Sequence, residues 1–336
     1  MKSCFIAENS GTLKAVYPKS VVDQLNEQFN LVSQDAYSKA YVLENKEEFL
    51  DIEYIFSTWS MPKFTEDEIK EVFPSLKAVF YAAGSVQGFA RPFLECGVKV
   101  FSAWAANAEP VAEMSVAHII LANKGYHMSA FYGSQSASLR QKSVEFCVNN
   151  RGNYGCKVGI LGLGMIGARV CNLLKNYNLE ILAFDPFCSD EKAKALGVKL
   201  ASLEEIFSEC EVISNHIANN EQTKGMLKYE HFRLMHKYAT FINTGRGAQV
   251  IEEDLIRALK EEPCRCAVLD VTDPEPPRED SPFFEMDNVI LTPHIAGSQR
   301  DEWHRMAEYM LSEAVAYTNG DAVKYSVSIE MLATMA

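Results

Sequence analysis

A glycine-rich stretch between residues 157 and 167 constrains the fold of this chain more than any other segment. The sequence Lys157-Val-Gly-Ile-Leu-Gly-Leu-Gly-Met-Ile-Gly167 mixes apolar residues with glycines, and apolar residues at helical spacing follow it. This pattern predicts a buried strand, a tight turn and a helix. Gly162, Gly164 and Gly167 have the G-x-G-x-x-G spacing of dinucleotide-binding turns. In such turns the glycines permit a sharp bend, close approach of a pyrophosphate and close packing of the helix on the strand.

The start of the predicted helix and an acidic residue beyond it complete the nucleotide-binding pattern. The N–H groups at Met165 and Ile166 begin the helix, where free donors and the helix dipole favour phosphate. Asp185 ends a second apolar run and lies eighteen residues beyond Gly167, where a carboxylate binds the adenine ribose in such folds. The alternative is a capping aspartate in a turn with Pro186. We favour the ribose role because strand, turn, helix, strand and acid occur in order.

Length, charge and cysteine content limit the class of protein. The 336 residues suggest two domains, and 48% hydrophobic residues are enough for well-formed cores. The formal net charge of −13 argues against a general nucleic-acid or anionic-membrane surface, although a small anionic substrate needs only a local cationic site. Nine scattered cysteines are typical of reduced thiols in a cytoplasmic protein, and the close pair Cys264 and Cys266 lacks the spacing of a metal site. We therefore expect no metal. The apolar run at the start of the chain is too short for a signal peptide, and the longest apolar stretch, residues 116–122, is too short to span a membrane, so we expect neither.

The first 104 residues alternate short apolar runs with helical patterns, which predicts a parallel sheet covered by helices. Two loops follow predicted strands and are candidates for substrate binding. Trp59 lies in the first loop, and Gly84 and Ser85 in the second could offer backbone N–H groups to a carboxylate. Packing for Trp59 and a surface turn for residues 84–87 are equally open. The predicted elements are strands at 4–7, 41–43, 54–57, 78–81 and 98–101, and helices at 18–29 and 65–73, the latter opened by a capping box at Thr65 and Glu68.

The second half resembles a complete nucleotide-binding domain. A helix is predicted from Asn107 to about Phe131 with Pro110 in its first turn, and residues 133–154 are read as a connecting arm. His118 and His127, near this helix, are interpreted as packed or surface histidines. Six strands follow, at 157–161, 180–184, 211–214, 239–242, 267–269 and 289–291, and a C-terminal helix begins near residue 298. The predicted fold is α/β, with two Rossmann-like or flavodoxin-like domains of doubly wound parallel sheets and a cleft between them. The predicted division is residues 1–104 plus 298–336 for substrate and 105–297 for the nucleotide.

Three predicted strand ends of the second domain carry residues suited to chemistry. Arg246 stands between two glycines, and its guanidinium can bind a carboxylate and polarise a carbonyl. Glu275 lies in a proline-rich loop that fixes its geometry. His294 follows Pro293, and beside a carboxylate it becomes a general acid or base. Taken singly, each has a plainer interpretation: a surface ion pair, an acidic turn and a structural histidine. Together they suit hydride transfer to a 2-keto acid, with the proton from His294 and the hydride from a nicotinamide.

These motifs resemble the D-isomer-specific 2-hydroxyacid dehydrogenases. The glycine turn with Asp185, the segment Asn243-Thr-Gly-Arg246-Gly247, the segment Leu269–Pro276 and the segment Thr292-Pro-His294-Ile-Ala-Gly agree with that family in order and spacing. The resemblance implies catalytic roles for Arg246, Glu275 and His294, and positions for Thr244, His216 and Asp270 on the cofactor side. It also implies a small 2-keto or 2-hydroxy acid as substrate, and a homodimer joined through the nucleotide domains.

Some features depart from the family pattern or leave alternatives. Residues 83–87 lack an aspartate often found there, Met165 replaces a more polar residue, and Glu275 argues against a formate dehydrogenase.

Asp185 would repel a 2′-phosphate and residues 186–189 offer no arginine, which predicts NAD(H) rather than NADP(H). Some relatives with this fold act as corepressors, so an NAD(H)-sensing binding protein is the alternative to an enzyme. The sequence does not name the substrate or the direction of reaction.

Overall fold

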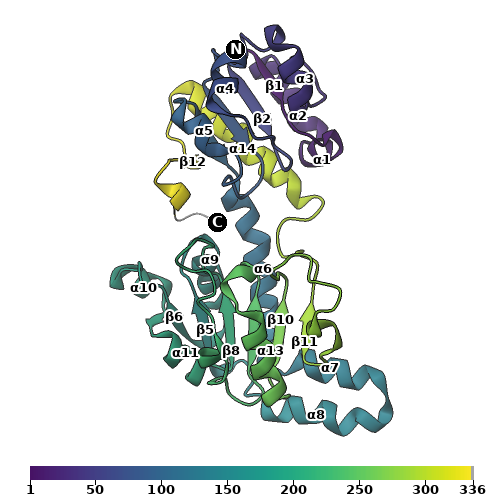
Figure 1. The fold of residues 1–336 in the computed structure, drawn as a ribbon. Helices are drawn as coiled ribbons and strands as arrows, with labels where there is room; N and C mark the ends of the chain where they lie inside the picture. The colour runs from purple at the N-terminus through teal and green to yellow at the C-terminus, as the bar shows by residue number, and fades with distance from the viewer. Residues whose placement is uncertain (334–336) are drawn as a thin grey trace. The chain divides into compact units, whose positions relative to one another are not determined.

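The computed structural model describes residues 1–333 and forms two compact units (Figure 1). Unit 1 consists of Met1–Asn107 and the chain from Ser298 onward, and unit 2 consists of Ala108–Gly297. Each unit has its own sheet and its own hydrophobic cores on the two faces of that sheet.

Unit 1 is built on a five-stranded sheet in the order β1-β2-β3-β4-β12. The first four strands are parallel, and the short β12 pairs antiparallel with β4. The buried carboxylate of Glu313 accepts hydrogen bonds from the N–H groups of Lys324 and Tyr325 and so fixes the chain entering β12. The strands are β1 (Ser3–Phe5), β2 (Tyr54–Ser57), β3 (Ala78–Tyr81), β4 (Lys99–Ser102) and β12 (Ser326–Val327).

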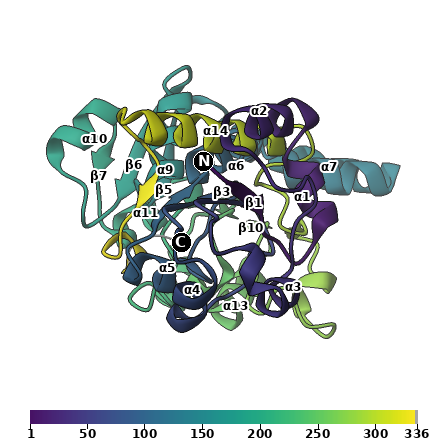
Figure 2. The ribbon, with the colours of Figure 1, turned by 90° about the horizontal axis from the view of Figure 1, so that it is seen from above.

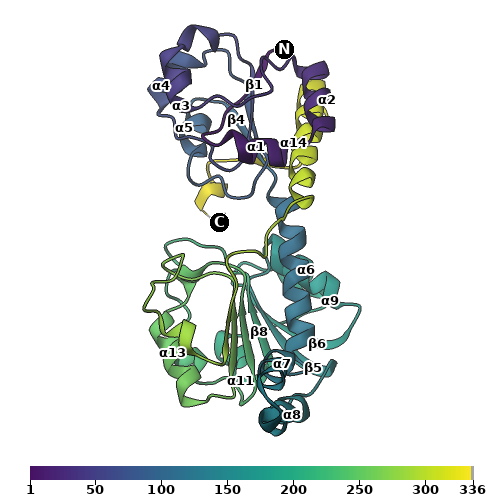
Figure 3. The same ribbon diagram turned by 90° about the vertical axis from the view of Figure 1, so that its right-hand side faces the viewer.

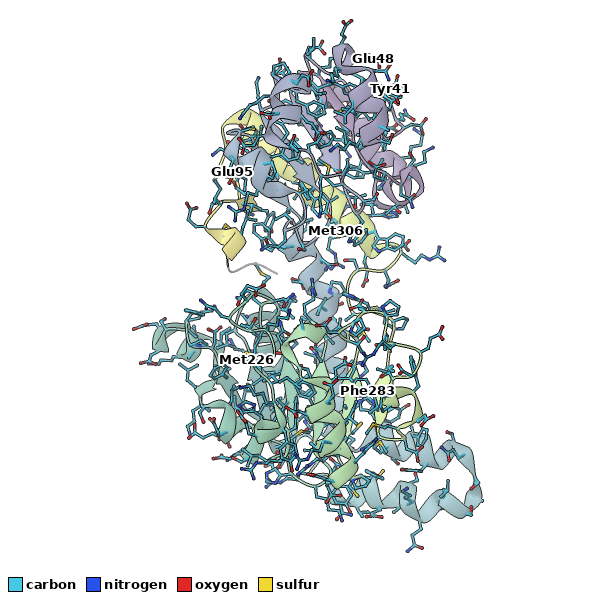
Figure 4. All side chains as sticks on the ribbon, viewed as in Figure 1. Tyr41, Glu48, Glu95, Met226, Phe283 and Met306 are labelled. Atoms are coloured by element: carbon cyan, nitrogen blue, oxygen red, sulfur yellow. The ribbon has the colours of Figure 1, made fainter. Side chains whose placement is uncertain are left out.

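Helices cover both faces of this sheet because successive strand residues point to opposite sides. Phe56, Phe80 and Phe101 face one layer of helices, while Ile55 and Val79 face the other. Figure 2 shows α2 and α14 on one side of the sheet and α4 and α5 on the other, and Figure 4 labels the buried Met306 on α14. The first layer is α1 (Ser10–Val16), α2 (Lys19–Phe29) and α14 (Glu302–Asn319); the second is α3 (Lys39–Glu44), α4 (Glu66–Val72) and α5 (Ala90–Glu95).

Most predictions for unit 1 are confirmed, but one strand was wrong. The strands at 54–57 and 78–81 have the predicted bounds, and the capping box at Thr65 and Glu68 opens α4. Residues 41–43 lie in helix α3, which begins after the Ser38 cap and buries only Val42. Tyr41 is 40% exposed and donates its hydroxyl to Glu48; both are labelled in Figure 4. A run of three apolar residues does not distinguish a strand from one turn of helix.

Unit 2 is built on a seven-stranded parallel sheet in the order β11-β10-β9-β8-β5-β6-β7. The six predicted strands are confirmed within a few residues at their ends, and β7 is an additional edge strand of two residues. The strands are β5 (Tyr154–Leu161), β6 (Asn178–Phe184), β7 (Lys199–Leu200), β8 (Val212–Asn215), β9 (Thr240–Asn243), β10 (Cys266–Leu269) and β11 (Val289–Leu291).

Two helical layers enclose the sheet of unit 2 (Figure 3). One core lies beneath α6 to α9, and the other lies beneath α11 to α13. The helices are α6 (Trp104–Ala122), α7 (Tyr126–Gln135), α8 (Arg140–Asn149), α9 (Met165–Leu174), α10 (Asp190–Leu196), α11 (Leu203–Glu209), α12 (Tyr229–Phe232) and α13 (Glu252–Glu261). Short 3₁₀ turns occur in both units at η1 (Lys46–Glu48), η2 (Ala137–Leu139), η3 (Gly247–Gln249), η4 (Pro282–Glu285) and η5 (Met331–Ala333).

The long helix and the connecting arm differ from the prediction. The helix begins earlier, so Pro110 lies inside α6 rather than in its first turn. It ends at Ala122, and Gly125, with φ of 63°, turns the chain into α7. The predicted arm is helical: α7 and α8 lie side by side as a hairpin (Figure 1). Its weak amphipathic pattern concealed it, since only Met128, Tyr132 and Phe146 are buried.

The described residues include free cysteines, and they contain no metal cluster and no membrane-crossing helix. All nine cysteines are free thiols. Within residues 1–333, no group of His, Cys, Asp or Glu is arranged to hold a metal ion. In the same described part, no helix has the length and apolarity needed to cross a membrane.

Candidate functional site

Six strands of unit 2 end in one row, and this row positions the candidate site. The parallel registers align the last residues of β6, β5, β8, β9, β10 and β11 across the sheet. The chain leaves every strand at the same edge, where ligands of open α/β sheets bind. The aligned residues are Phe184, Leu161, Asn215, Asn243, Leu269 and Leu291, and those that follow them directly are Asp185, Gly162, His216, Thr244, Asp270 and Thr292.

The glycine turn has room for a phosphate only at its second glycine. Gly162 has φ of 86°, and a Cβ added there would lie 2.7 Å from the carbonyl oxygen of His216. A Cβ on Gly167 would lie 1.9 Å from the carbonyl oxygen of Gly162, so the helix packs directly on the turn. A Cβ on Gly164 would meet nothing within 4 Å. Helix α9 begins at Met165 with no side-chain cap, so its first N–H groups face the open position. These features fit the pyrophosphate of a dinucleotide.

Asp185 holds the glycine turn with its carboxylate. Its Oδ2 accepts the N–H of Leu163 at 2.8 Å, and its Oδ1 accepts the N–H of Phe187 at 2.9 Å. The second bond is the local turn that the capping interpretation describes. Each oxygen keeps a second lone pair, so the geometry also allows a ribose contact, which stays a prediction. Lys192, which belongs to no sequence motif of the site, places its Nζ 2.7 Å from the carbonyl oxygen of Leu163.

His216 and Thr244 are buried at the same edge of the sheet. His216 is 7% exposed, and its Nε2 pairs with the Ser214 hydroxyl at 2.9 Å. Burial lowers the pKa of His216 to about 3, so the ring is neutral near pH 7 and does not serve as a proton donor there. Its Nδ1 has no hydrogen-bond partner in the described part of the chain. Thr244 shares a hydrogen bond of 3.0 Å with the Ser115 hydroxyl on α6, which sequence spacing did not reveal.

Arg246 is half-buried. A Cβ on the following Gly247 would lie 2.0 Å from the backbone carbon of Thr272, so the backbone of residue 272 closely approaches this loop. One guanidinium nitrogen, Nη1, donates to the carbonyl oxygen of Gly245 at 2.8 Å. Burial lowers the pKa of Arg246, and the charge of Glu275 opposes that shift. No carboxylate within residues 1–333 forms an ion pair with this guanidinium, so it is a partly desolvated cation able to bind an anion.

Glu275 and His294 form a close pair. The Nδ1 of His294 lies 2.6 Å from Oε1 of Glu275, and both side chains are about two-fifths exposed. A carboxylate at Nδ1 fixes the ring orientation and leaves Nε2 as the nitrogen that can exchange a proton with a substrate. His294 has φ of 54°, a conformation uncommon for residues other than glycine.

Asp270 secures the loop that carries His294. It is 2% exposed, and its carboxylate accepts hydrogen bonds from the Thr292 hydroxyl at 2.5 Å and from the N–H groups of Ile295 and Ala296, both at 2.8 Å. The N–H of His294 donates to the backbone carbonyl oxygen of Asp270 at 3.0 Å. Asp270 is therefore an anchor of residues 292–296; its predicted contact with a cofactor stays a prediction.

The two candidate substrate-binding loops of unit 1 differ in the role that their contacts support. Trp59 packs between the two cores of unit 1, and its ring lies 6.0 Å from that of Trp303 at an angle of 72°. This geometry supports packing. The carbonyl oxygen of Gly84 accepts a hydrogen bond from the Ser102 hydroxyl at 2.6 Å. Among the described residues, the N–H groups of Gly84 and Ser85 have no acceptor, so they are free to bind an anion.

His118 and His127 are packing residues. Their ring centroids lie 5.2 Å apart, and burial lowers the pKa of both side chains, that of His127 to about 4. Each ring has a buried nitrogen without a partner in the described chain. The interpretation as packed histidines is supported for this pair.

The fold and the glycine turn define a Rossmann-type domain, and the pair of His294 and Glu275 lies beyond the row of its strand ends. The family model "D-isomer specific 2-hydroxyacid dehydrogenase, NAD binding domain" matches residues 128–296, which is half of the chain. The chain belongs to the D-isomer specific 2-hydroxyacid dehydrogenase family, and these residues are its NAD-binding domain.

Relatives support the same family. The chain is 35% identical to the glyoxylate reductase of Korarchaeum cryptofilum over 179 residues, or 53% of this chain and 54% of that protein. It is 30% identical to the D-3-phosphoglycerate dehydrogenase of Methanocaldococcus jannaschii over 263 residues, or 75% of this chain and 47% of that protein. The chain thus spans about half the length of these relatives. The crystal structure of Rhodotorula graminis D-mandelate dehydrogenase matches with a TM-score of 0.82 at 18% identity, covering 97% of both chains, which shows the shared fold.

The glycine turn generates a paired prediction. Gly167→Ala forces its new methyl group against the Gly162 carbonyl and should lower the free energy of unfolding by roughly 1–3 kcal/mol. Gly164→Ala meets open space and should change stability by less than about 0.5 kcal/mol. It should nevertheless weaken NADH binding, because its methyl group occupies the position that the pyrophosphate approaches. Urea unfolding and NADH fluorescence titration measure the two effects. Equal stability losses in the two variants would contradict this account of the turn.

Proposed function

We propose that this chain is an NAD-dependent dehydrogenase that interconverts a small 2-keto acid and its D-2-hydroxy acid. The observation that carries the proposal is the 2.6 Å pair of His294 and Glu275, on a strand edge that also carries the unpaired cation Arg246. The family membership and the open space at Gly164 support the binding of NAD. The names of the relatives, glyoxylate reductase and D-3-phosphoglycerate dehydrogenase, support a small acid as the substrate class.

Each residue has a distinct task in the reducing direction. Arg246 binds the substrate carboxylate and polarises the neighbouring keto oxygen, because its guanidinium offers several donors and has no internal anion to displace. His294 donates a proton from Nε2 to the developing alkoxide, while Glu275 holds Nδ1 and orients the ring. When bound, the reduced nicotinamide supplies the hydride. In the oxidising direction His294 takes the proton back as a general base.

The catalytic assignment is tested by NADH oxidation with a panel of 2-keto acids. Arg246→Ala should lower kcat/KM by about 100-fold or more, because the transition-state charge loses its donor. His294→Ala should lower kcat by roughly 100- to 10,000-fold, because proton transfer is lost. The exposed residues of the same unit provide matched controls: Arg233→Ala and His236→Ala should retain wild-type rates.

Either catalytic variant with wild-type turnover would remove the role assigned to that residue. Tight NADH binding by the wild type, with no turnover of any acid in the panel, would instead favour the alternative of an NAD(H)-sensing binding protein. We favour the enzyme because the proton donor, its carboxylate partner and the unpaired cation are all present.

We further propose a preference for NADH over NADPH. Asp185 lies at the end of β6 with its carboxylate on the glycine turn, where it would repel a 2′-phosphate. Lys192 is the one cation whose contact with this turn is described, and its Nζ is engaged by the carbonyl of Leu163. Steady-state kinetics with both cofactors should give a higher kcat/KM for NADH, and Asp185→Ala should narrow the difference. A preference of the wild type for NADPH would overturn the assignment.

We also propose a homodimer formed through unit 2. The surface of α6, α7 and α8 supports it, because Leu121, Tyr126, Val144 and Val148 are between 36% and 71% exposed. Val148→Asp places a charge on the most exposed of these side chains and should shift the mass measured by light scattering towards the monomer. Val32→Asp, at an exposed valine of unit 1, should leave the mass unchanged. A wild-type chain that is already monomeric at micromolar concentration would refute the dimer.

A further inference from the structure

Three buried amide side chains lie directly beneath the arginine loop. Asn215 ends β8, Asn243 ends β9, and Gln249 lies in the 3₁₀ turn that follows Arg246. Asn215 and Gln249 are fully buried, and Asn243 is 1% exposed. Three amides in the interior are costly unless each polar atom is paired, so their hydrogen bonds indicate what they are for.

The three amides bind one another. Asn215 donates from Nδ2 to Oδ1 of Asn243 at 3.1 Å and to Oε1 of Gln249 at 2.9 Å. The register of β8 and β9 places Asn215 opposite Asn243, so the first contact follows from the sheet. The second contact ties the turn after Arg246 back to the sheet.

Asn243 and Gln249 also hold Arg246 on both sides of its backbone. The N–H of Arg246 donates to Oε1 of Gln249 at 3.3 Å, and its carbonyl oxygen accepts from Nδ2 of Asn243 at 3.0 Å. The N–H of Gly245 donates to Oδ1 of Asn243 at 3.1 Å. The carbonyl oxygen of Gly245 accepts the Arg246 guanidinium, so the network also positions the group that receives the charged side chain.

The same amides hold the loop beside the glycine turn. The N–H of Ile217 donates to Oδ1 of Asn215 at 3.2 Å, and its carbonyl oxygen accepts from Nε2 of Gln249 at 2.8 Å. A Cβ on Gly162 would lie 3.0 Å from the Cα of Ile217, so this loop touches the glycine turn. One network thus joins the loop of the substrate-binding cation to the wall of the cofactor turn.

We propose that Asn215, Asn243 and Gln249 are positioning residues that hold Arg246 at a fixed place relative to the glycine turn. Gln249 is central, because its oxygen accepts from both Arg246 and Asn215 and its nitrogen reaches Ile217. Its effect on catalysis rests on the proposed function, in which Arg246 binds the substrate carboxylate; its effect on the order of the loop does not.

The test compares Gln249→Met with a matched buried amide elsewhere in unit 2. Asn288 is 6% exposed and donates to the carbonyl oxygens of Leu259 and Arg265, so Asn288→Leu removes buried hydrogen bonds that do not reach Arg246. With NADH and glyoxylate, Gln249→Met should lower kcat/KM by about 100-fold through misplacement of the arginine. Asn288→Leu should lower stability but leave kcat/KM near wild type.

Two further readouts separate positioning from general stability. When Arg246→Ala is already present, Gln249→Met should lower kcat/KM only slightly further, because both changes remove the same contribution of the arginine. Hydrogen exchange should become faster in the peptide that contains residues 244–247 for Gln249→Met and not for Asn288→Leu. Asn215→Ala spares the bond between Gln249 and the Arg246 N–H, so it should give a smaller loss; it also serves as the variant if Gln249→Met does not fold.

The outcomes distinguish the two proposals. If the wild type reduces glyoxylate, a kcat/KM in Gln249→Met equal to that of the wild type would overturn the positioning role. Losses in kcat/KM that add fully to those of Arg246→Ala would overturn it as well. Either result would leave the proposed function intact. Absence of turnover by the wild type on the whole keto-acid panel would overturn the proposed function. In that case hydrogen exchange tests whether the amide network holds the arginine loop. Unchanged protection of residues 244–247 in Gln249→Met overturns this role of the network, and faster exchange there upholds it.

Discussion

The in-register ending of six parallel strands is the constraint on which the candidate site of unit 2 depends. Parallel pairing places the last residues of the six strands in one row, so each strand delivers its next few residues to the same edge. A residue's distance beyond the row then determines its use. Among the residues directly after the row, His216, Thr244 and Asp270 are buried, whereas Arg246 and His294, each three positions beyond the row, are more exposed.

Much of this arrangement could be predicted from sequence because it depends on local patterns. Short apolar runs identified six strands of unit 2, and the glycine spacing of residues 162–167 identified the turn. The predictions failed where tertiary contacts decide. Tyr41 lies in a helix selected by the Ser38 cap, and the hairpin of α7 and α8 buries too few side chains to show a helical period. The role of Trp59 depended on Trp303, far along the chain.

The buried amides show why a site's support is harder to predict than its reactive groups. Arg246, Glu275 and His294 stand out in the sequence because reactive side chains are unusual in segments rich in glycine and proline. Asn215 and Gln249 are thirty-four residues apart and resemble ordinary polar residues in the sequence. The pairing of β8 with β9 brings Asn215 to Asn243, and the turn after Arg246 brings Gln249 to Asn215. Their burial shows that these hydrogen bonds are needed.

Asp270 and Arg246 illustrate two opposite uses of a charge at one edge of a sheet. The carboxylate of Asp270 is buried and accepts three hydrogen bonds from residues 292–296, so its oxygens are occupied in holding that loop. The guanidinium of Arg246 is partly buried and forms no ion pair in the described chain, so its charge is available. A cation left unpaired while its backbone is held by buried amides is costly for folding alone. That cost is explained if an anionic ligand completes the site, which is the physical reason for placing the substrate carboxylate at Arg246.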